Sequence, residues 1–146
     1  MATFAEHKKI LKAIQILKPQ LEKVVDAMGV LAVNHYTTSF RNQGFTDESL
    51  QAWKPRKRTE RSRMGNRAIL VKSGRLRRSI RSKRFGVFSI KIYTDIPYAS
   101  VHNNGERSGR GKGFKMPKRQ FIGYSGVLNR KIISKMDVTI KKIFNK

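Results

Sequence analysis

Apolar residues in the first third of the chain recur at steps of three and four, a spacing that places side chains along one face of an α-helix. The series is Ile10, Ile14, Leu17, Leu21, Val24, Met28 and Leu31. Pro19 falls inside it, and because proline lacks a backbone N–H and disfavours helical geometry in the preceding residue, we predict a kink or two successive helices. The same spacing also suits a coiled coil, but the series spans only about three heptads and contains a proline. We therefore predict that the helix packs on the protein's own sheet.

A second apolar series of helical spacing lies near the C-terminus. Ser125 precedes it, and serine caps helices by accepting a hydrogen bond from a free backbone N–H. Lys135, Lys141 and Lys142 take the other faces. The pattern predicts an amphipathic helix whose apolar face consists of Leu128, Ile132, Met136, Ile140 and Ile143 or Phe144.

The central part of the chain has the alternation typical of strands. In the segment 87–94, Phe88, Ile90 and Ile92 alternate with Ser89, Lys91 and Tyr93. Leu76 and Ile80 are separated by an even step, and Phe85-Gly86 supplies a turn, so we predict a hairpin over residues 76–94 with arginines on its outer face. A further strand is predicted over 116–122, at a sheet edge because of Pro117.

Short helices and loops are predicted between these elements. Pro97 suits the start of a helix that Asn104-Gly105 would end with a left-handed residue. Residues 106–113 are rich in glycine and charge, which predicts a flexible loop. Between residues 41 and 68 apolar side chains are few, so we predict an ordered loop and then a mobile arm. Asp47-Glu48 suits the first turn of a helix.

Together these segments predict an α+β fold in one domain, residues 1–146. A small twisted antiparallel β-sheet packs against long N-terminal and C-terminal α-helices. A basic extended loop or arm occupies about residues 42–69.

The chain carries a large excess of positive charge. It has 33 lysines and arginines against 9 acidic residues, a formal net charge of +24. Such a charge concentrates polyanions, so a nucleic acid, an anionic membrane surface or an acidic protein face is an expected partner. Residues 54–84 contain fourteen of the basic residues and one acid, Glu60. A block of one sign is typical of a binding arm rather than a surface that only aids solubility.

The basic residues that we predict to face DNA or another partner come mostly from this block. They are Arg56, Lys57, Arg58, Arg61, Arg63, Arg77, Arg81, Lys83, Arg84, Arg110 and Lys112. Trp53, Tyr93 and Phe85 could stack on bases, but the aromatic motif of a single-strand-binding sheet is missing, so we interpret them as packing residues.

Several kinds of chemistry lack their sequence signals. The absence of cysteine excludes disulfides, thiolate metal sites and thiol nucleophiles. The acids are scattered, and His7, His35 and His102 share no metal-ligand spacing. The glycines of 105–113 lack the Gly-Lys-Ser/Thr ending of a nucleotide-binding loop. No signal peptide or membrane-spanning stretch is present. We expect no enzyme activity, metal, cofactor, small-molecule substrate or membrane attachment.

Three ordered segments resemble one protein family. They are Leu70-Val-Lys-Ser-Gly-Arg-Leu-Arg-Arg-Ser-Ile80, Pro97-Tyr-Ala-Ser-Val-His-Asn-Asn-Gly105 and Met116-Pro-Lys-Arg-Gln-Phe-Ile-Gly123, preceded by Trp53-Lys-Pro55. Their order and spacing resemble the phage virion-morphogenesis proteins, the tail-completion and head-tail-joining subunits to which the Mu G-like proteins belong. Lys118 and Gln120 depart from the family pattern. Gly44 lies nine residues before the tryptophan, so we interpret 45–52 as a short helical insertion.

The resemblance implies a role for the motif residues and for the whole chain. The motif residues are structural: Trp53, Pro55, Gly74, Leu76, Ile80, Tyr98, Ala99, His102, Gly105, Pro117, Arg119 and Phe121. Gly74 and Gly105 allow unusual backbone conformations, Tyr98 and Phe121 are core or interface aromatics, and His102 hydrogen-bonds neighbouring backbone.

For the whole chain the resemblance implies a virion subunit, made in the host cytoplasm and assembled as a ring, a hexamer, where the tail meets the neck. Its partners would be further copies, neighbouring neck and tail proteins, and DNA in the lumen. A stand-alone nucleic-acid-binding protein is the alternative that the charge leaves open. A nuclease is disfavoured because clustered carboxylates are missing.

Overall fold

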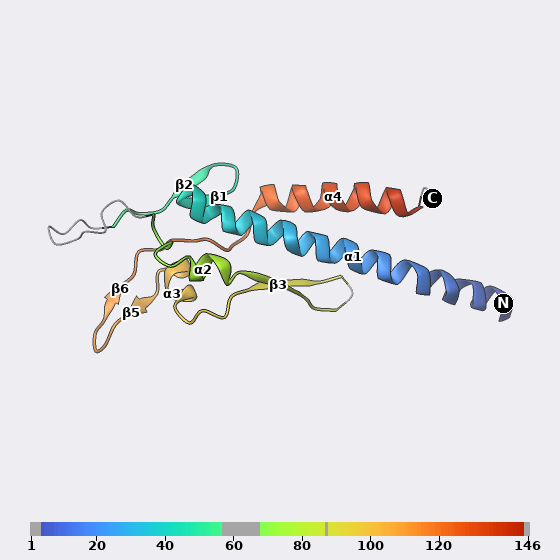
Figure 1. Ribbon diagram of the computed structural model, residues 1–146, viewed down its shortest axis with the longest axis horizontal. Coiled ribbons are helices and arrows are strands. Elements are labelled where there is room, and N and C mark those ends of the chain that lie inside the picture. Colours follow the sequence, from blue (N-terminus) through green and yellow to red (C-terminus); the bar gives the residue numbers. More distant parts are fainter. Residues whose placement is uncertain (1–3, 57–67, 87, 145–146) are drawn as a thin grey trace.

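The computed structural model describes residues 4–56, 68–86 and 88–144 (Figure 1). A long helix, α1, lies between the C-terminal helix α4 and the β3–β4 hairpin, and it contacts both. The α+β class predicted from the sequence is confirmed. The elements, in chain order, are α1 Phe4–Asn42, β1 Gly44–Thr46, β2 Leu50–Ala52, α2 Arg75–Arg78, β3 Arg81–Arg84, β4 Ile90–Tyr93, α3 Ala99–Asn104, β5 Arg107–Ser108, β6 Phe114–Lys115 and α4 Gly126–Phe144.

Helix α1 continues through Pro19 for 39 residues, so the predicted division into two helices is wrong. Because Pro19 has no backbone N–H, the Gln15 carbonyl receives no hydrogen bond within the helix. Both residues are exposed, so water can supply this hydrogen bond. The predicted apolar stripe is buried at Val24 and Met28. Nearer the N-terminus it is not covered, since Ile14 is 54% exposed.

The chain turns back on itself directly after α1. Gln43 has a φ of 55°, and β1 then pairs antiparallel with β2, with Phe45 opposite Gln51. The Trp53 N–H donates to the Gln43 carbonyl at 2.8 Å and extends the pairing. The predicted helical insertion over 45–52, and the helical turn at Asp47, are therefore wrong. Phe45 is 3% exposed, so its burial holds this hairpin on the helices.

The predicted hairpin over 76–94 is confirmed only in its second part. Residues 75–78 form the helical turn α2, because the step of four between Leu76 and Ile80 suits a helix as well as a strand. Gly74 precedes this turn with a φ of 67°, which L-residues rarely adopt. Strands β3 and β4 pair from Arg81↔Tyr93 to Arg84↔Ile90, and Phe85 N–H donates to the Ser89 carbonyl at 2.8 Å across the predicted turn.

The β3–β4 hairpin packs on α1 at a position where the helix has no side chain. A Cβ atom at Gly29 would lie 2.8 Å from Ser82 Oγ, so a larger residue would push the hairpin away. Arg84 adds ion pairs from β3 to the same helix, at 2.7 Å to Glu22 and 2.6 Å to Asp26. The hairpin is thus attached to α1 by close contact and by charge.

The segment after β4 departs from the prediction in two places. The short helix α3 ends at Gly105 with a φ of 75°, as predicted. The glycine-rich stretch is not a plain loop, since β5 and β6 pair antiparallel across it. The strand predicted over 116–122 is absent from the described structure. The backbone N–H groups there bond to α3 instead: Arg119 N–H to the His102 carbonyl at 2.8 Å and Phe121 N–H to Asn103 Oδ1 at 2.9 Å.

Two buried clusters form the core along α1. In the first, the centroid of the Phe40 ring lies 5.2 Å from the centroid of the Phe121 ring and 5.5 Å from that of the Trp53 ring. The second joins Tyr36 and Leu128, and so attaches α4 to α1. The apolar face predicted for α4 is confirmed. Leu128 is buried, and the later residues of this face are half-buried: Ile132, Met136, Ile140 and Ile143.

The N-terminus of α4 is capped from two places in the chain. Ser125 Oγ accepts a hydrogen bond from Leu128 N–H at 3.1 Å, which confirms the predicted cap. Asp47, in the β1–β2 turn, accepts from Ser125 Oγ at 2.7 Å and from Val127 N–H at 3.0 Å. These two hydrogen bonds, first that from Ser125, lower the pKa of Asp47 below its ordinary value of 3.8.

We expect Phe40→Ala to lower the free energy of unfolding by about 3–5 kcal/mol, because it leaves a cavity between Trp53 and Phe121. Phe88→Ala is the control. Phe88 is 72% exposed, and its loss should change stability by no more than about 0.5 kcal/mol. Urea denaturation followed by circular dichroism measures both, and equal effects of the two substitutions would contradict this core assignment.

We expect Asp47→Asn to destabilise the fold near neutral pH and to have no effect in acid. A carboxyl whose folded-state pKa is lowered contributes stability above its unfolded pKa of 3.8, and this contribution disappears as the pH falls through the folded-state value. Urea denaturation at about pH 7 and about pH 2.5 tests this. Glu48→Gln, at the exposed partner of Arg130, is the control. A difference between variant and wild type that persists in acid would refute the role of the Asp47 charge.

Candidate partner-binding surfaces

The motif segments that are separate in the sequence meet in the first core cluster. Trp53, Leu76, Ile80, Ala99 and Phe121 are all buried there. Each segment thus contributes at least one apolar side chain to the same core. Of the other motif residues, Gly74 and Gly105 are buried, Pro117 is half-buried and Pro55 is exposed.

Hydrogen bonds join the Trp-Lys-Pro segment to the Pro117–Phe121 segment. Trp53 Nε1–H donates to the Gln120 carbonyl at 2.7 Å. Arg119 is 7% exposed, and its Nε and Nη2 donate to the Lys54 carbonyl at 3.2 and 3.0 Å. Burial, and then repulsion by Arg56, lowers the pKa of Arg119 from its ordinary value, but arginine remains charged at physiological pH. Arg119 therefore ties two motif segments together and does not face a partner.

Asn103 is a structural residue that the sequence analysis missed. Its Oδ1 accepts hydrogen bonds from Phe121 N–H at 2.9 Å and Ile122 N–H at 3.0 Å. It occupies an unspecified position of the Tyr-Ala-x-x-His-x-x-Gly motif. Asparagine side chains near the end of a helix commonly hydrogen-bond backbone groups. The position of Asn103 two residues before Gly105 is the sequence signal that could have identified it.

Tyr98 and His102 lie at the edge of the core. Tyr98 is 44% exposed and meets the His102 ring edge to face, with centroids 5.9 Å apart. His102 Nδ1 is buried and has no hydrogen-bond partner within the described structure. Burial, and then the nearby Arg119, lowers the pKa of His102 below 6.5. The ring is therefore neutral at physiological pH.

Most acidic side chains of the described segments already have a partner within the chain. Glu22 and Asp26 pair with Arg84, Glu48 pairs with Arg130, and Asp137 pairs with Lys141. Asp47 is bonded at the start of α4, and Glu106 accepts from Asn104. The acids thus stabilise the fold locally, and the large surplus of lysine and arginine is left uncompensated.

The basic residues predicted to face a partner are distributed over the molecule. Arg77, Arg81 and Lys83 are exposed on α2 and β3, and Arg110 and Lys112 are exposed between β5 and β6. Arg84 is engaged with α1. Arg56 is exposed and donates to the Ala68 carbonyl at 3.1 Å. The other four, Lys57, Arg58, Arg61 and Arg63, and with them most of the predicted arm, lie outside the described residues.

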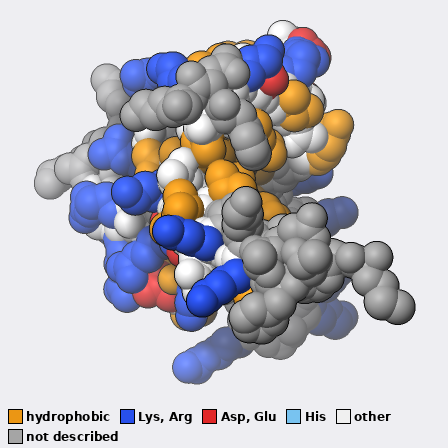
Figure 2. All heavy atoms as spheres, turned by 90° about the vertical axis from the view of Figure 1, so that its right-hand side faces the viewer, with side chains coloured by type: hydrophobic (Ala, Val, Ile, Leu, Met, Phe, Trp, Pro, Cys, Tyr) orange, Lys and Arg blue, Asp and Glu red, His pale blue; other side chains and the backbone are white. Residues whose placement is uncertain are grey.

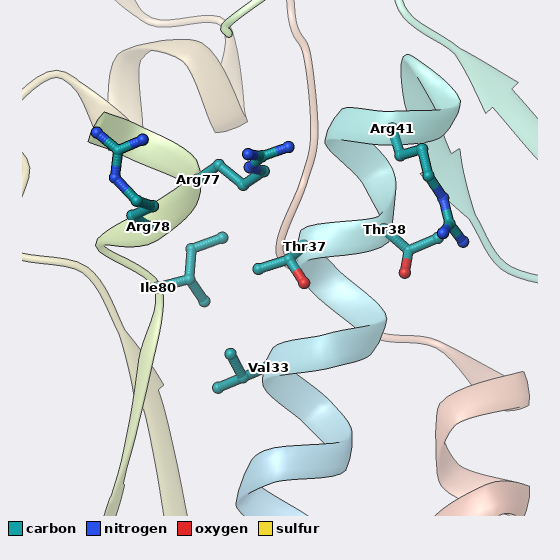
Figure 3. A pocket seen from close by; sticks show the side chains of 7 residues that line it. All are labelled: Val33, Thr37, Thr38, Arg41, Arg77, Arg78 and Ile80. Atoms are coloured by element: carbon teal, nitrogen blue, oxygen red, sulfur yellow. The ribbon is translucent and has the colours of Figure 1, made fainter. Parts of the chain in front are cut away.

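A cleft of about 410 Å³ separates the C-terminal part of α1 from α2 (Figure 3). The helix contributes Val33, Thr37, Thr38 and Arg41, and the other wall consists of Arg77, Arg78 and Ile80. Val33 and Ile80 lie low in the cleft, and the arginines lie towards its upper end in this view. The cleft has the size of many ligand sites, about 300–1,000 Å³. The cleft thus combines arginine side chains with an apolar base.

Exposed apolar side chains gather at the end of the molecule to which the start of α1 and the end of α4 both point (Figure 2). Leu11, Ile14 and Val138 are each about half exposed on the two helices. Phe85 and Phe88, at the turn of the β3–β4 hairpin, are 75% and 72% exposed. The prediction that Phe85 is a packing residue is therefore wrong within this chain. Figure 2 shows apolar side chains between bordering basic ones, as at many protein interfaces.

Within the described segments, no three histidine or acidic side chains are placed to hold a metal ion. His35 instead packs edge to face against Tyr36 and Phe45, with ring centroids at 5.5 and 6.4 Å. Burial, and then Lys131, lowers its pKa below 6.5. None of the described helices is long and apolar enough to cross a bilayer.

Comparison with known families gives one match. The model of the phage virion morphogenesis family matches residues 3–141. No curated protein and no solved structure matches this chain. The match covers α1, all of the motif segments and α4 as far as residue 141.

We expect His102→Gln to reduce the loss of stability on acidification. The unfolded chain binds a proton at His102 more readily than the folded one, so the contribution of this residue is complete above about pH 6.5 and is lost as the pH falls through its folded-state pKa. Urea denaturation at about pH 7.5 and about pH 5 measures the loss. His35 retains its own contribution in the variant. Tyr98→Phe is the control, and a pH dependence unchanged by His102→Gln would contradict this assignment.

Proposed function

We propose that this chain, which belongs to the phage virion morphogenesis family, is a tail-completion or head-tail-joining subunit. Family membership gives it a structural or assembly role in the virion. The finer proposal is a ring of copies, a hexamer, at the junction of neck and tail and around the DNA channel. In this role the protein acts by contact with its neighbours and catalyses no reaction.

The observation that carries the proposal is that the chain leaves most of its positive charge without acidic partners of its own. The described acids are mostly paired within the chain, while the net charge is +24. A compact protein with such a surplus is stabilised by a negatively charged neighbour, and DNA or an acidic virion protein meets this need. Arg77, Arg81 and the β5–β6 loop are the exposed basic positions that we assign to these contacts.

Copies of the chain need a surface of another kind to associate, because like charges repel. The apolar side chains at the end formed by α1, α4 and the β3–β4 hairpin supply one (Figure 2). Burying such side chains contributes roughly 25 cal/mol for each Å² removed from water. We assign the contact between neighbouring copies to this end of the molecule.

A stand-alone nucleic-acid-binding protein is the second candidate, and the net charge favours it. Such a protein would bind DNA as a monomer or dimer, with an affinity that falls steeply with salt. A ring subunit would instead be present in purified virions at a fixed copy number. Mass spectrometry of virions separates the two candidates.

We expect Arg77→Glu combined with Arg81→Glu to reduce the yield of infectious particles at least about tenfold, because like-charge contacts cost several kcal/mol. The control is Lys54→Glu with Lys118→Glu, two exposed residues that change the net charge equally and lie outside the surfaces assigned to partners. Plaque assays, with electron microscopy for unattached heads and tails, measure the effect. Circular dichroism establishes that each variant folds.

Fully infectious particles from the Arg77 and Arg81 variant would refute the placement of these residues. Absence of the protein from purified wild-type virions would refute the structural role itself.

A further inference from the structure

The cleft between α1 and α2 carries positive charge that the fold does not use. Arg41 and Arg77 are exposed and have no hydrogen-bond or ion-pair partner within the described structure. Arg78 differs, since its Nη2 donates to the Ser73 carbonyl at 2.9 Å and holds the side chain back on its own segment. Figure 3 shows Arg77 extending from α2 towards α1, while the Arg41 side chain lies on α1 beside Thr38. Two guanidinium groups without a partner in the described structure therefore line one cleft.

The base of the same cleft is apolar. Ile80 belongs to the first core cluster and is 4% exposed, and Val33 packs against that cluster. The hydroxyls of Thr37 and Thr38 both donate to the Asn34 carbonyl, at 3.0 and 2.9 Å, so they offer the cleft no hydrogen-bond donor. The cleft thus presents donors at its rim and hydrocarbon at its base.

This combination fits a protein segment better than it fits DNA. Phosphates lie along a convex rod, and exposed lysines and arginines neutralise them without a cleft. An apolar base offers a phosphate nothing, whereas it can bury an aliphatic or aromatic side chain. Excluding water in this way also strengthens a neighbouring arginine–carboxylate pair, which arginine can form with two parallel hydrogen bonds.

A second copy of this chain is a poor source of the carboxylates. Among the acids whose side chains the structure describes, Asp95 alone has no hydrogen-bond or ion-pair partner. It lies beside Arg75, Arg78 and Arg81, in a smaller cleft of its own. To donate any other of these acids to the cleft, a neighbouring copy would have to break a contact of its own fold. Charge complementarity therefore favours a different protein.

We propose that the cleft between α1 and α2 binds an acidic segment of a neighbouring virion protein, one that places an apolar side chain on Val33 and Ile80 and carboxylates on Arg41 and Arg77. This inference rests on the proposed function, and it names the kind of partner that the basic surface contacts. The partner is recognised by the pattern of acid and hydrocarbon together. The remaining basic surface stays available for DNA.

Photo-crosslinking in infected cells tests the proposal. Thr37→p-benzoylphenylalanine places the crosslinker within the cleft, and Ser134→p-benzoylphenylalanine, at an exposed position of α4, is the control site. We expect Thr37 to crosslink to a different virion protein, at a segment with at least two acidic residues next to an apolar one. Mass spectrometry of the crosslinked peptide identifies the segment.

Charge reversal then tests the arginines. Arg41→Glu with Arg77→Glu should reduce the Thr37 crosslink at least about tenfold, because both ion pairs are lost. The equal charge change Lys54→Glu with Lys118→Glu, at exposed residues outside the cleft, should leave it intact. If the reversed variant does not fold, Arg41→Gln with Arg77→Gln removes the two charges without adding acids, and it should weaken the same crosslink.

Three results would overturn the proposal: a Thr37 crosslink to DNA, to a second copy or to a neutral or basic segment; a crosslink that survives loss of both arginine charges; or no crosslink from Thr37 while that variant is present in particles. Failure of the proposed function has a different signature, the absence of the wild-type protein from purified virions. The crosslink in infected cells still decides the occupant of the cleft in that case.

Discussion

Packing against α1 is the interaction on which the rest of the structure depends. Within the described residues the strands form three separate two-stranded sheets, and an isolated hairpin of this kind is marginally stable in water. The β1–β2 and β3–β4 hairpins and α4 all contact α1, whose buried stripe extends from Val24 to Phe40. The helix therefore takes the place of a continuous sheet. At Gly29 there is no room for a Cβ atom beside Ser82 of β3, so the absence of a side chain there helps to set the position of the hairpin.

The elements that the sequence predicted correctly are those whose signal is local. Helix α4 was predicted from its period and from Ser125, and the end of α3 from Gly105, because caps and periodicity depend only on nearby residues. One error arose where two structures share one pattern. A step of four between Leu76 and Ile80 suits both a strand and a helical turn, and only Gly74 and the packing of α2 decide between them.

Other features depend on residues far apart in the sequence, so no local pattern could reveal them. Asp47 was interpreted as the start of a helix, yet it caps α4, whose first residue is about eighty positions later. The cleft combines Arg77, which the charge pattern predicted, with Arg41, which was not among the predicted site residues. Only the tertiary structure brings these two arginines to one cleft with Val33 and Ile80.

One short motif links the fold to the proposed contacts. In the segment 73–80, Gly74 permits the backbone to enter α2, and Leu76 and Ile80 anchor that turn in the core. Arg77 follows a buried residue in a helical turn, so its side chain is directed away from that anchor and across the cleft towards α1. The same residues that fix the turn therefore fix the place of the guanidinium group. Because the anchor is rigid, a partner that engages Arg77 need not order the backbone that carries it, and less conformational entropy is lost on binding.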